Sequence, residues 1–358
     1  MIRKQKIAEF SKRPVYQYTL ANKNGMELAI LNYGGTIREL LFQDKTGKKE
    51  NRILSYKDIA LYEENPMFFG AIIGRVAGRI KNGTFVLAGK EYQVEKNEGN
   101  QHLHGGNKGF HHRFWLVEAA QESTLDRLVL HLQDQSQDGY PGDLQVCVTY
   151  TLSEDNMWRI HYQVETDQPT LCNMTNHTYF NLSGMKNSDI LQHALQIQAD
   201  QVACVDEKTL PTGNYLATKS DEVFNFTKPR TIGRYGMHGH KQQELVQGGY
   251  DHAFLLSKKQ QDDIILFEKN SGIKVRVKTT EEAVVLYTCN KVTQAYPLEY
   301  GNLKPYTGLT LETQAMPDRI HSDRPELVVI TKDKPYDSST SYAFSLEEET
   351  KERNGGFK

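Results

Sequence analysis

Short apolar runs that end at turn residues recur along this chain from end to end. Residues 273–280, IKVRVKTT, alternate apolar and charged side chains with a period of two, which is typical of a strand with one face in water. Turn sequences such as NYGG, KNG, DGYPGD and LPTG separate the runs. Only residues 55–66 fit a short helix. The pattern predicts an all-β protein, a large antiparallel β-sandwich with few short helices. The expected strands cover residues 26–35, 36–44, 126–133, 144–153, 158–166, 194–200, 273–280 and 283–290.

The chain carries no marker of a domain boundary. It has no Pro- or Ser-rich linker, no shift of composition and no repeat of fixed period. Its 358 residues are many for one domain, but all-β domains commonly reach about 200–250 residues. We therefore expect a single β-sandwich domain over residues 1–346. Residues 347–358 are charged and contain glycine, which predicts a frayed C-terminal tail.

Charge and cysteine usage limit the partners and the compartment. The formal net charge is −2, so no global field attracts nucleic acid or an anionic membrane. No apolar signal segment follows the N-terminal basic residues, and no run reaches the roughly 18 apolar residues of a membrane span. The four cysteines lie far apart in apolar surroundings, as expected for buried free thiols. We expect a cytoplasmic protein without nucleic-acid or membrane partners, either a monomer or a homodimer.

The segment 175–184, TNHTYFNLSG, is the densest group of hydrogen-bonding residues beside aromatic rings. His177 lies between two side-chain amides, Asn176 and Asn181. Such a group suits a sugar, which offers many hydroxyls and one apolar face. Histidine also exchanges protons near neutral pH, since its ordinary pKa is about 6.5. Taken alone, His177 is either a proton-transfer group or a hydrogen-bonded structural residue.

Two carboxylates stand out further along the chain. Glu312 lies in the otherwise uncharged run TGLTLETQ, where an acid is costly unless it has a partner or a function. Asp251 lies between glycines and an apolar strand in GGYDHAFLL. It could accept strong hydrogen bonds from sugar hydroxyls, or it could simply form a turn.

Histidines and arginines gather in two glycine-containing segments. Residues 97–115 hold His102, His104, His111 and His112. His102 and His104 would share one face of a strand and could chelate zinc, but no Cys, Asp or Glu follows closely to complete a coordination sphere. The glycines after His104 instead indicate a loop that approaches a ligand. In GRVAGR, Arg75 and Arg79 either donate to sugar oxygens or form surface ion pairs, and no nucleotide-binding context follows.

Taken together and in this order, NYGGTI, GRVAGR, LHGG, TNHTYFNLSG, YDH and LETQ resemble the aldose 1-epimerase (galactose mutarotase) family over nearly the whole chain. The resemblance implies a galactose mutarotase-like supersandwich that uses no metal and no organic cofactor. It implies an isomerase of carbohydrate metabolism that binds free aldohexoses such as galactose and glucose and interconverts their α and β anomers. By the same resemblance, Glu312 matches the general base and His177 the general acid, which we expect to be charged at rest. Arg79, His104 and Asp251 match substrate-binding positions.

Two positions depart from the family pattern. Gly78 stands where Asn is frequent and Val285 stands where Gln is frequent, which removes two side chains able to contact sugar hydroxyls, so substrate preference stays open. One alternative is an epimerase that prefers the reducing end of a disaccharide such as maltose. Another is a non-catalytic sugar-binding protein on the same fold. A glycoside hydrolase would need two carboxylates, and a hexose-6-phosphate epimerase would need an arginine cluster. The roles of His102, His111 and His112 also stay open.

Overall fold

The computed structural model describes residues 1–121, 125–135, 138–184 and 188–347, and three antiparallel sheets contain most of the strands. The nine-stranded sheet runs in the order β11-β12-β13-β14-β30-β24-β23-β18-β21. Its strands are β11 (Leu116–Gln121), β12 (Leu125–Asp134), β13 (Leu144–Ser153), β14 (Met157–Thr166), β30 (Tyr336–Leu346), β24 (Ile273–Thr279), β23 (Ile264–Glu268), β18 (Ala194–Ile197) and β21 (Arg230–Thr231).

The other two sheets have six and five strands. The six-stranded sheet consists of β17 (Tyr179–Phe180), β28 (Leu309–Gln314), β25 (Ala283–Tyr287), β22 (Asp251–Leu256), β19 (Ala199–Val205) and β20 (Pro211–Ala217), in that order. The N-terminal sheet is a meander of β1 (Ile2–Phe10), β2 (Arg13–Ala21), β3 (Glu27–Leu31), β4 (Ile37–Gln43) and β5 (Lys49–Asn51). The α-helices of the described residues are α1 (Leu61–Glu64) and α2 (Lys241–Leu245). The predicted all-β antiparallel fold is therefore confirmed.

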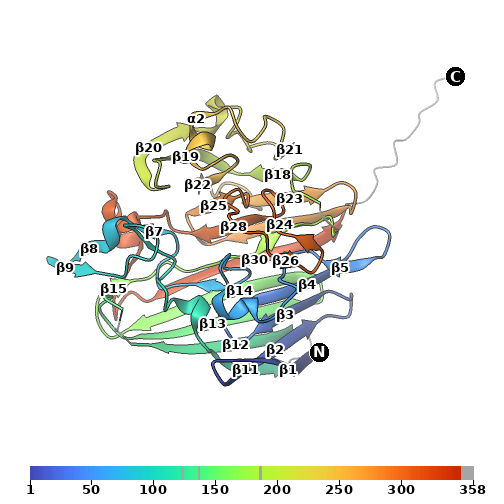
Figure 1. The fold of residues 1–358 in the computed structure, drawn as a ribbon, viewed down its shortest axis with the longest axis horizontal. Coiled ribbons are helices and arrows are strands. Elements are labelled where there is room, and N and C mark those ends of the chain that lie inside the picture. Colours follow the sequence, from blue (N-terminus) through green and yellow to red (C-terminus); the bar gives the residue numbers. More distant parts are fainter. Residues whose placement is uncertain (122–124, 136–137, 185–187, 348–358) are drawn as a thin grey trace.

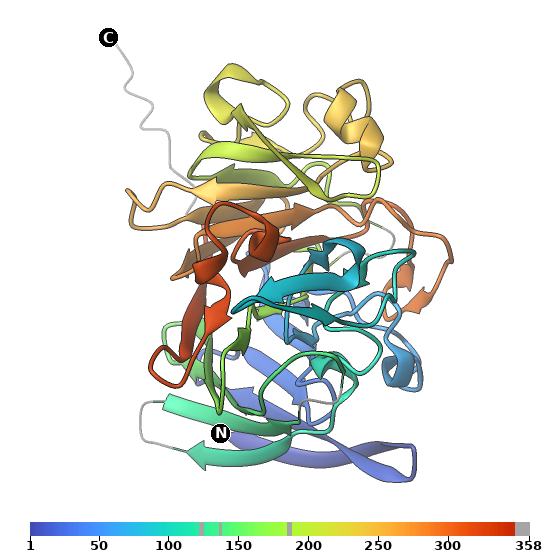
Figure 2. The same ribbon diagram turned by 90° about the vertical axis from the view of Figure 1, so that its left-hand side faces the viewer.

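Five short ribbons join loops around these sheets. They pair β16 (Thr175–Asn176) with β6 (Ile72–Ile73), β10 (His102–Leu103) with β7 (Arg79–Ile80), β8 (Thr84–Leu87) with β9 (Lys90–Gln93), β15 (Thr170–Leu171) with β29 (Val329–Ile330), and β26 (Pro297–Leu298) with β27 (Gly301–Asn302). Figure 1 shows β1–β3 beside β11–β13, and β19, β20 and α2 at the opposite end of the molecule. In Figure 2 the hairpin β8–β9 and the red segment after β28 lie together on the side facing the viewer.

One hydrophobic core joins the three sheets. Along β13 every second side chain is buried, beginning at Leu144, as the alternation in the sequence predicts. These side chains pack in one cluster with Leu28 and Ile30 of the N-terminal sheet and with Phe254 and Leu286 of the six-stranded sheet. The core therefore fixes how the six-stranded sheet, which carries the site, lies on the rest.

Other expectations have mixed outcomes. The helix expected over 55–66 is reduced to α1. The run 194–200 divides between two sheets, since β18 pairs in the nine-stranded sheet and β19 in the six-stranded one. The expected C-terminal tail, apart from Glu347, lies outside the described residues. No helix among the described residues is long and apolar enough to span a bilayer.

Candidate active site

The register of three central strands places the acidic candidates on one face of the six-stranded sheet. Glu312 of β28 lies opposite Val285 of β25, which in turn lies opposite Ala253 of β22. In the next row, two residues along each strand, Asp251 lies opposite Tyr287. Residues two apart on a strand point to the same face. Glu312 and Asp251 therefore face the same space, although 61 positions separate them in the sequence.

His177 reaches this space from the segment TNHTYFNLSG, which lies along the edge of the same sheet. Tyr179 pairs with Thr310 of β28. The His177 backbone N–H donates to the Ala71 carbonyl at 3.0 Å, and its carbonyl accepts from the Gly70 N–H at 3.0 Å. The segment is thus held on both sides, and the His177 imidazole is directed toward Glu312.

Side chains within the segment secure its path. Asn176 Nδ2 donates to the Gly70 carbonyl at 2.8 Å. Asn181 Nδ2 donates to the Thr307 carbonyl at 2.8 Å, just before β28 begins. Both amides therefore bond to backbone and shape the loop, so neither is directed at a ligand.

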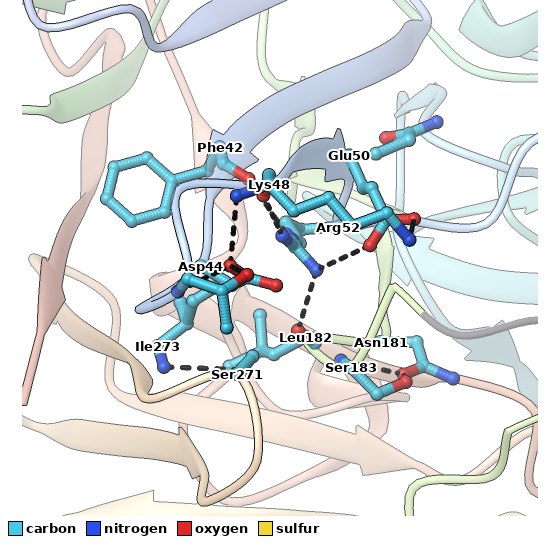
Figure 3. A network of polar contacts seen from close by, with 12 residues as sticks. Phe42, Asp44, Lys48, Glu50, Arg52, Asn181, Leu182, Ser183, Ser271 and Ile273 are labelled. Carbon is cyan, nitrogen blue, oxygen red and sulfur yellow. Dashed lines mark hydrogen bonds and ion pairs between the residues drawn. The ribbon is translucent and has the colours of Figure 1, made fainter.

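A buried arginine holds the far end of this segment (Figure 3). Arg52 is fully buried, and its Nε donates to the Phe42 carbonyl at 3.0 Å while its Nη1 donates to the Leu182 carbonyl at 3.3 Å. Glu50 lies 3.6 Å away and balances part of the charge. Arg52 therefore ties the N-terminal sheet to the His177 segment. Nothing in its local sequence indicated this role.

The two proton-transfer candidates meet in a dry environment. His177 Nε2 lies 3.5 Å from Glu312 Oε1, and the side chain of each is 5% exposed. Burial lowers the pKa of His177 to about 4. Burial, reinforced by the charge of Asp251, raises the pKa of Glu312 to about 8, although Thr310 Oγ1 donates to its Oε1 at 3.0 Å. Burial penalises each charged form.

The resting charges therefore differ from the expectation of a charged His177. Between about pH 4 and pH 8 the pair holds one proton, and that proton rests on Glu312. The nearby carboxylate that was expected to keep His177 charged is itself neutral, because both groups lie beneath the surface. Since the two groups are in contact, the proton can pass between them, and the two limits describe the titration of the pair as a whole.

His104 completes one wall of the site from the LHGG loop. The loop pairs with the GRVAGR segment, because Leu103 lies opposite Arg79 and the His104 N–H donates to the Gly78 carbonyl at 3.1 Å. In return, the Gly78 N–H donates to His104 Nδ1 at 3.2 Å. Burial holds the pKa of His104 well below its usual value, so the ring is neutral. A neutral ring that accepts at Nδ1 carries its proton on Nε2, and His104 is therefore a donor toward the site.

This tautomer bears on the metal alternative. The ligand atoms of His104, His177 and Glu312 lie within 4.8 Å of one another. A metal-bound histidine normally donates its other ring N–H to an acceptor, whereas His104 accepts there. His102 is directed elsewhere, since its Nδ1 contacts the Glu95 carbonyl at 2.7 Å and its Nε2 contacts the Tyr140 hydroxyl at 2.8 Å. The donor set therefore fits hydrogen bonding to a sugar better than metal ligation.

Two ion pairs line the opposite part of the site. Arg79 donates from Nε and Nη2 to the two oxygens of Glu98, each at 2.6 Å. Lys291 Nζ lies 2.9 Å from Asp251 Oδ2. Burial would raise the pKa of Asp251, but the nearby charges of Lys291 and Arg79 outweigh it and lower the pKa. Asp251 therefore stays charged.

These residues enclose one cavity of about 220 Å³. It brings together all five residues predicted from the sequence, Arg79, His104, His177, Asp251 and Glu312. The departures Gly78 and Val285 also line it, whereas His102, His111 and His112 do not. Arg75 lies outside it in a buried ion pair with Asp134 at 2.6 Å.

Sequence reasoning missed several lining residues, among them Phe68, Glu98, Thr209, Tyr287 and Lys291. No local pattern signals Lys291 or Thr209, which lie in loops. Phe68 has a φ of +56°, which is unusual for a bulky residue and visible only in the structure. The centre of its ring lies 4.9 Å from that of His104 and 5.7 Å from that of His177, so it forms an apolar wall beside His177.

Known proteins are similar to this chain over almost its whole length. The sequence model of the family described as aldose 1-epimerase matches residues 16–343. Galactose mutarotase of Bos taurus is 33% identical over 324 residues, which are 90% of this chain and 92% of that protein. Maltose epimerase of Levilactobacillus brevis is 30% identical over 346 residues, 96% of this chain and 99% of that protein. The crystal structure of galactose 1-epimerase from Lactobacillus acidophilus superposes with a TM-score of 0.87 at 28% identity, covering 97% of this chain and 99% of that one.

Proposed function

The chain belongs to the aldose 1-epimerase family, and we propose that Glu312 and His177 are the base and the acid of its reaction. The protein is an isomerase that interconverts the α and β anomers of aldoses. The observation that carries the residue assignment is the 3.5 Å contact between His177 Nε2 and Glu312 Oε1 on the wall of the cavity.

The proposed reaction opens and recloses the hemiacetal. Glu312 removes the proton of the C1 hydroxyl while His177 gives its proton to the ring oxygen. The bond between C1 and the ring oxygen breaks, its electron pair goes to that oxygen, and C1 becomes a carbonyl carbon. After rotation about C1–C2, the ring oxygen attacks the other face of C1, and both protons return by the reverse path.

The single proton that Glu312 and His177 share at rest is the one that the proposed reaction needs. The reactive form has the proton on His177 and a charged Glu312, so the proton must first move from the carboxyl to the imidazole across their contact. A carboxyl whose pKa is about 8 and an imidazole whose pKa is about 4 hold one proton together at neutral pH. An acid and a base that each act in both directions need this shared proton.

Binding is assigned to the rest of the cavity. His104 offers its Nε2–H, Arg79 offers guanidinium N–H groups, and Asp251 offers carboxylate oxygens to sugar hydroxyls. Because C1 must rotate before the ring closes, tight contacts belong at the hydroxyls remote from C1. Holding the sugar this way converts binding energy into correct placement of C1.

The proposed substrates are free aldohexoses such as galactose and glucose, in the cytoplasm, with the enzyme as a monomer or homodimer. A second candidate is the reducing end of a disaccharide. Val285, Ala253 and Ala203 form a floor of small side chains beside Glu312, and one relative is a maltose epimerase. Sugar phosphates fit less well, because Arg79 and Lys291 both already pair with carboxylates.

The direct test is polarimetry of freshly dissolved α-galactose. Glu312→Gln and His177→Asn should each lower kcat by roughly 100- to 10,000-fold, the usual contribution of a proton-transfer group, while circular dichroism stays unchanged. Glu91→Gln in the exposed strand β9 is the matched control and should keep full activity. Near-normal rates in either site variant would refute the assignment. Rates of the unsubstituted enzyme on galactose, glucose, maltose and glucose 6-phosphate then decide between the substrates.

A further inference from the structure

Lys291 lines the cavity and makes more contacts than a counterion for Asp251 would require. Its Nζ donates to Asp251 Oδ2 at 2.9 Å and to Thr209 Oγ1 at 2.7 Å. Its backbone N–H donates to the Tyr287 hydroxyl at 3.1 Å. Two segments, the turn before β20 and the start of β22, therefore fix the ammonium group of a lysine that lies in the loop after β25.

The ammonium still has a donor to offer. A lysine ammonium carries three N–H groups, and within the described part of the chain only two of them have acceptors. The side chain is 24% exposed and lines the cavity. The third N–H is therefore available to a molecule inside the cavity.

The backbone of Thr209 adopts an unfavourable conformation that its surroundings must hold in place. Thr209 has a φ of +60° and is buried, and a β-branched residue rarely adopts the left-handed region. Such conformations persist where the surroundings fix them, and they gather at ligand sites. Phe68 and His104, which line the same cavity, also have positive φ.

The register shows which part of a sugar this group would meet. Asp251 lies on β22, two strands away from β28, which carries Glu312. Neighbouring strands are about 4.8 Å apart, so the two backbones are separated by about 10 Å. A sugar whose C1 lies at Glu312 and His177 therefore presents its remote hydroxyls toward Lys291.

We propose that Lys291 is a substrate-binding residue whose ammonium, fixed by Asp251 and Thr209, donates to an aldose hydroxyl remote from C1 and determines which aldoses the enzyme prefers. The inference rests on the proposed function, since it places C1 at Glu312. The competing explanation is a purely structural lysine that neutralises Asp251.

The experiment combines Lys291→Met with aldoses that each lack one hydroxyl. A charge-assisted hydrogen bond corresponds to about a tenfold to hundredfold change in affinity. Lys291→Met should raise KM for the parent sugar by about that factor. The same variant should bind one particular deoxy sugar as the unsubstituted enzyme does, because the contact is already missing there. Lys291→Arg should retain part of the affinity. Lys259→Met, at a lysine 75% exposed beside Asp200, is the control and should change nothing.

Two outcomes overturn the proposal. One is an equal rise of KM for the parent and for every deoxy sugar, which a structural counterion predicts. The other is no rise for any sugar. Should Lys291→Met fail to fold, Thr209→Val keeps the ammonium but removes one anchor, and it must show a smaller rise with the same dependence on one hydroxyl. Activity of the unsubstituted enzyme and of Glu312→Gln tests the acid–base pair separately, so failure of one idea is distinguishable from failure of the other.

Discussion

Two carboxyl groups on the same face of one sheet differ in their resting charge, since Asp251 is ionised and Glu312 is neutral. Glu312 is buried and Asp251 is 15% exposed, and both line the same cavity, two strands apart. Lys291 lies beside Asp251 and holds its pKa below the usual value. Glu312 contacts a neutral imidazole and the Thr310 hydroxyl but no cation of the described residues, and its pKa rises to about 8. Burial acts on both, so the difference comes from the cation that one of them lacks.

Under the proposed mechanism, the comparison separates the cavity into a reacting end and a binding end. At the reacting end, Glu312 and His177 are held neutral and share one proton. At the binding end, Arg79 pairs with Glu98 and Lys291 pairs with Asp251. When the environment shifts the pKa values of two neighbouring titratable groups away from each other, the pair is typical of an acid and a base with assigned roles. Charge neutralised in advance also lets a neutral sugar enter without leaving an unpaired ion.

The largest effect expected from this contrast is on the pH profile. Below about pH 4 the pair gains a second proton and has no base, and above about pH 8 it loses its only proton and has no acid. Polarimetry should therefore give a bell-shaped kcat/KM with limits near pH 4 and pH 8. Two pH units above the upper limit, the activity should be about 100-fold lower, since each unit changes the active fraction tenfold.

Ordinary pKa values of the two groups would give a different profile. With 4.5 for the carboxyl and 6.5 for the imidazole, the plateau would span only those two units. The rate without enzyme must be subtracted at each pH, and circular dichroism must show a folded protein at both limits. A narrow plateau between pH 4.5 and 6.5 would show that burial does not shift the pKa values of the two groups.

A smaller effect is expected at the binding end. Arg79→Met removes donors to the sugar but leaves the proton pair intact, so KM should rise about tenfold with kcat nearly unchanged. Glu98→Gln should raise KM less, because it only loosens the bidentate grip on the guanidinium. Arg324→Met, at an exposed pair with Glu326, is the control. A loss of kcat with unchanged KM would place Arg79 at the reacting end.

Much of the fold could be read from alternation, because it is a local property. The runs 144–153 and 273–280 show their buried face directly, and they form β13 and β24. The division of residues 194–200 between two sheets could not be predicted from the sequence, because both halves show the same alternation of apolar and polar residues. It is set by distant partners: Gln198 donates to the Asp263 carbonyl and its own carbonyl accepts from Ser257.

The site divides in the same way. An acid in an apolar strand made Glu312 visible, and the ordered motifs related it to His177. The charge state of the pair was not visible, because it depends on burial by several segments. Lys291 meets Asp251 across 40 positions, and Arg52 meets Leu182 across 130. Contacts between loops so far apart leave no pattern in one sequence.

The smallest expected effect comes from substituting Val285, which lies between the reacting end and the binding end of the cavity. Val285 lies directly opposite Glu312 and lines the cavity, so cross-strand side chains there are about 5 Å apart at Cβ. In Val285→Gln the amide can donate to the Glu312 carboxylate and favour its charged form, which lowers its pKa. The upper limit of the pH profile should move down by up to about one unit, the equivalent of one hydrogen bond. Val285→Met has a similar length without a donor and should leave that limit in place or raise it. An equal downward shift in both variants would mean that side-chain volume, not the missing polar partner, keeps Glu312 protonated.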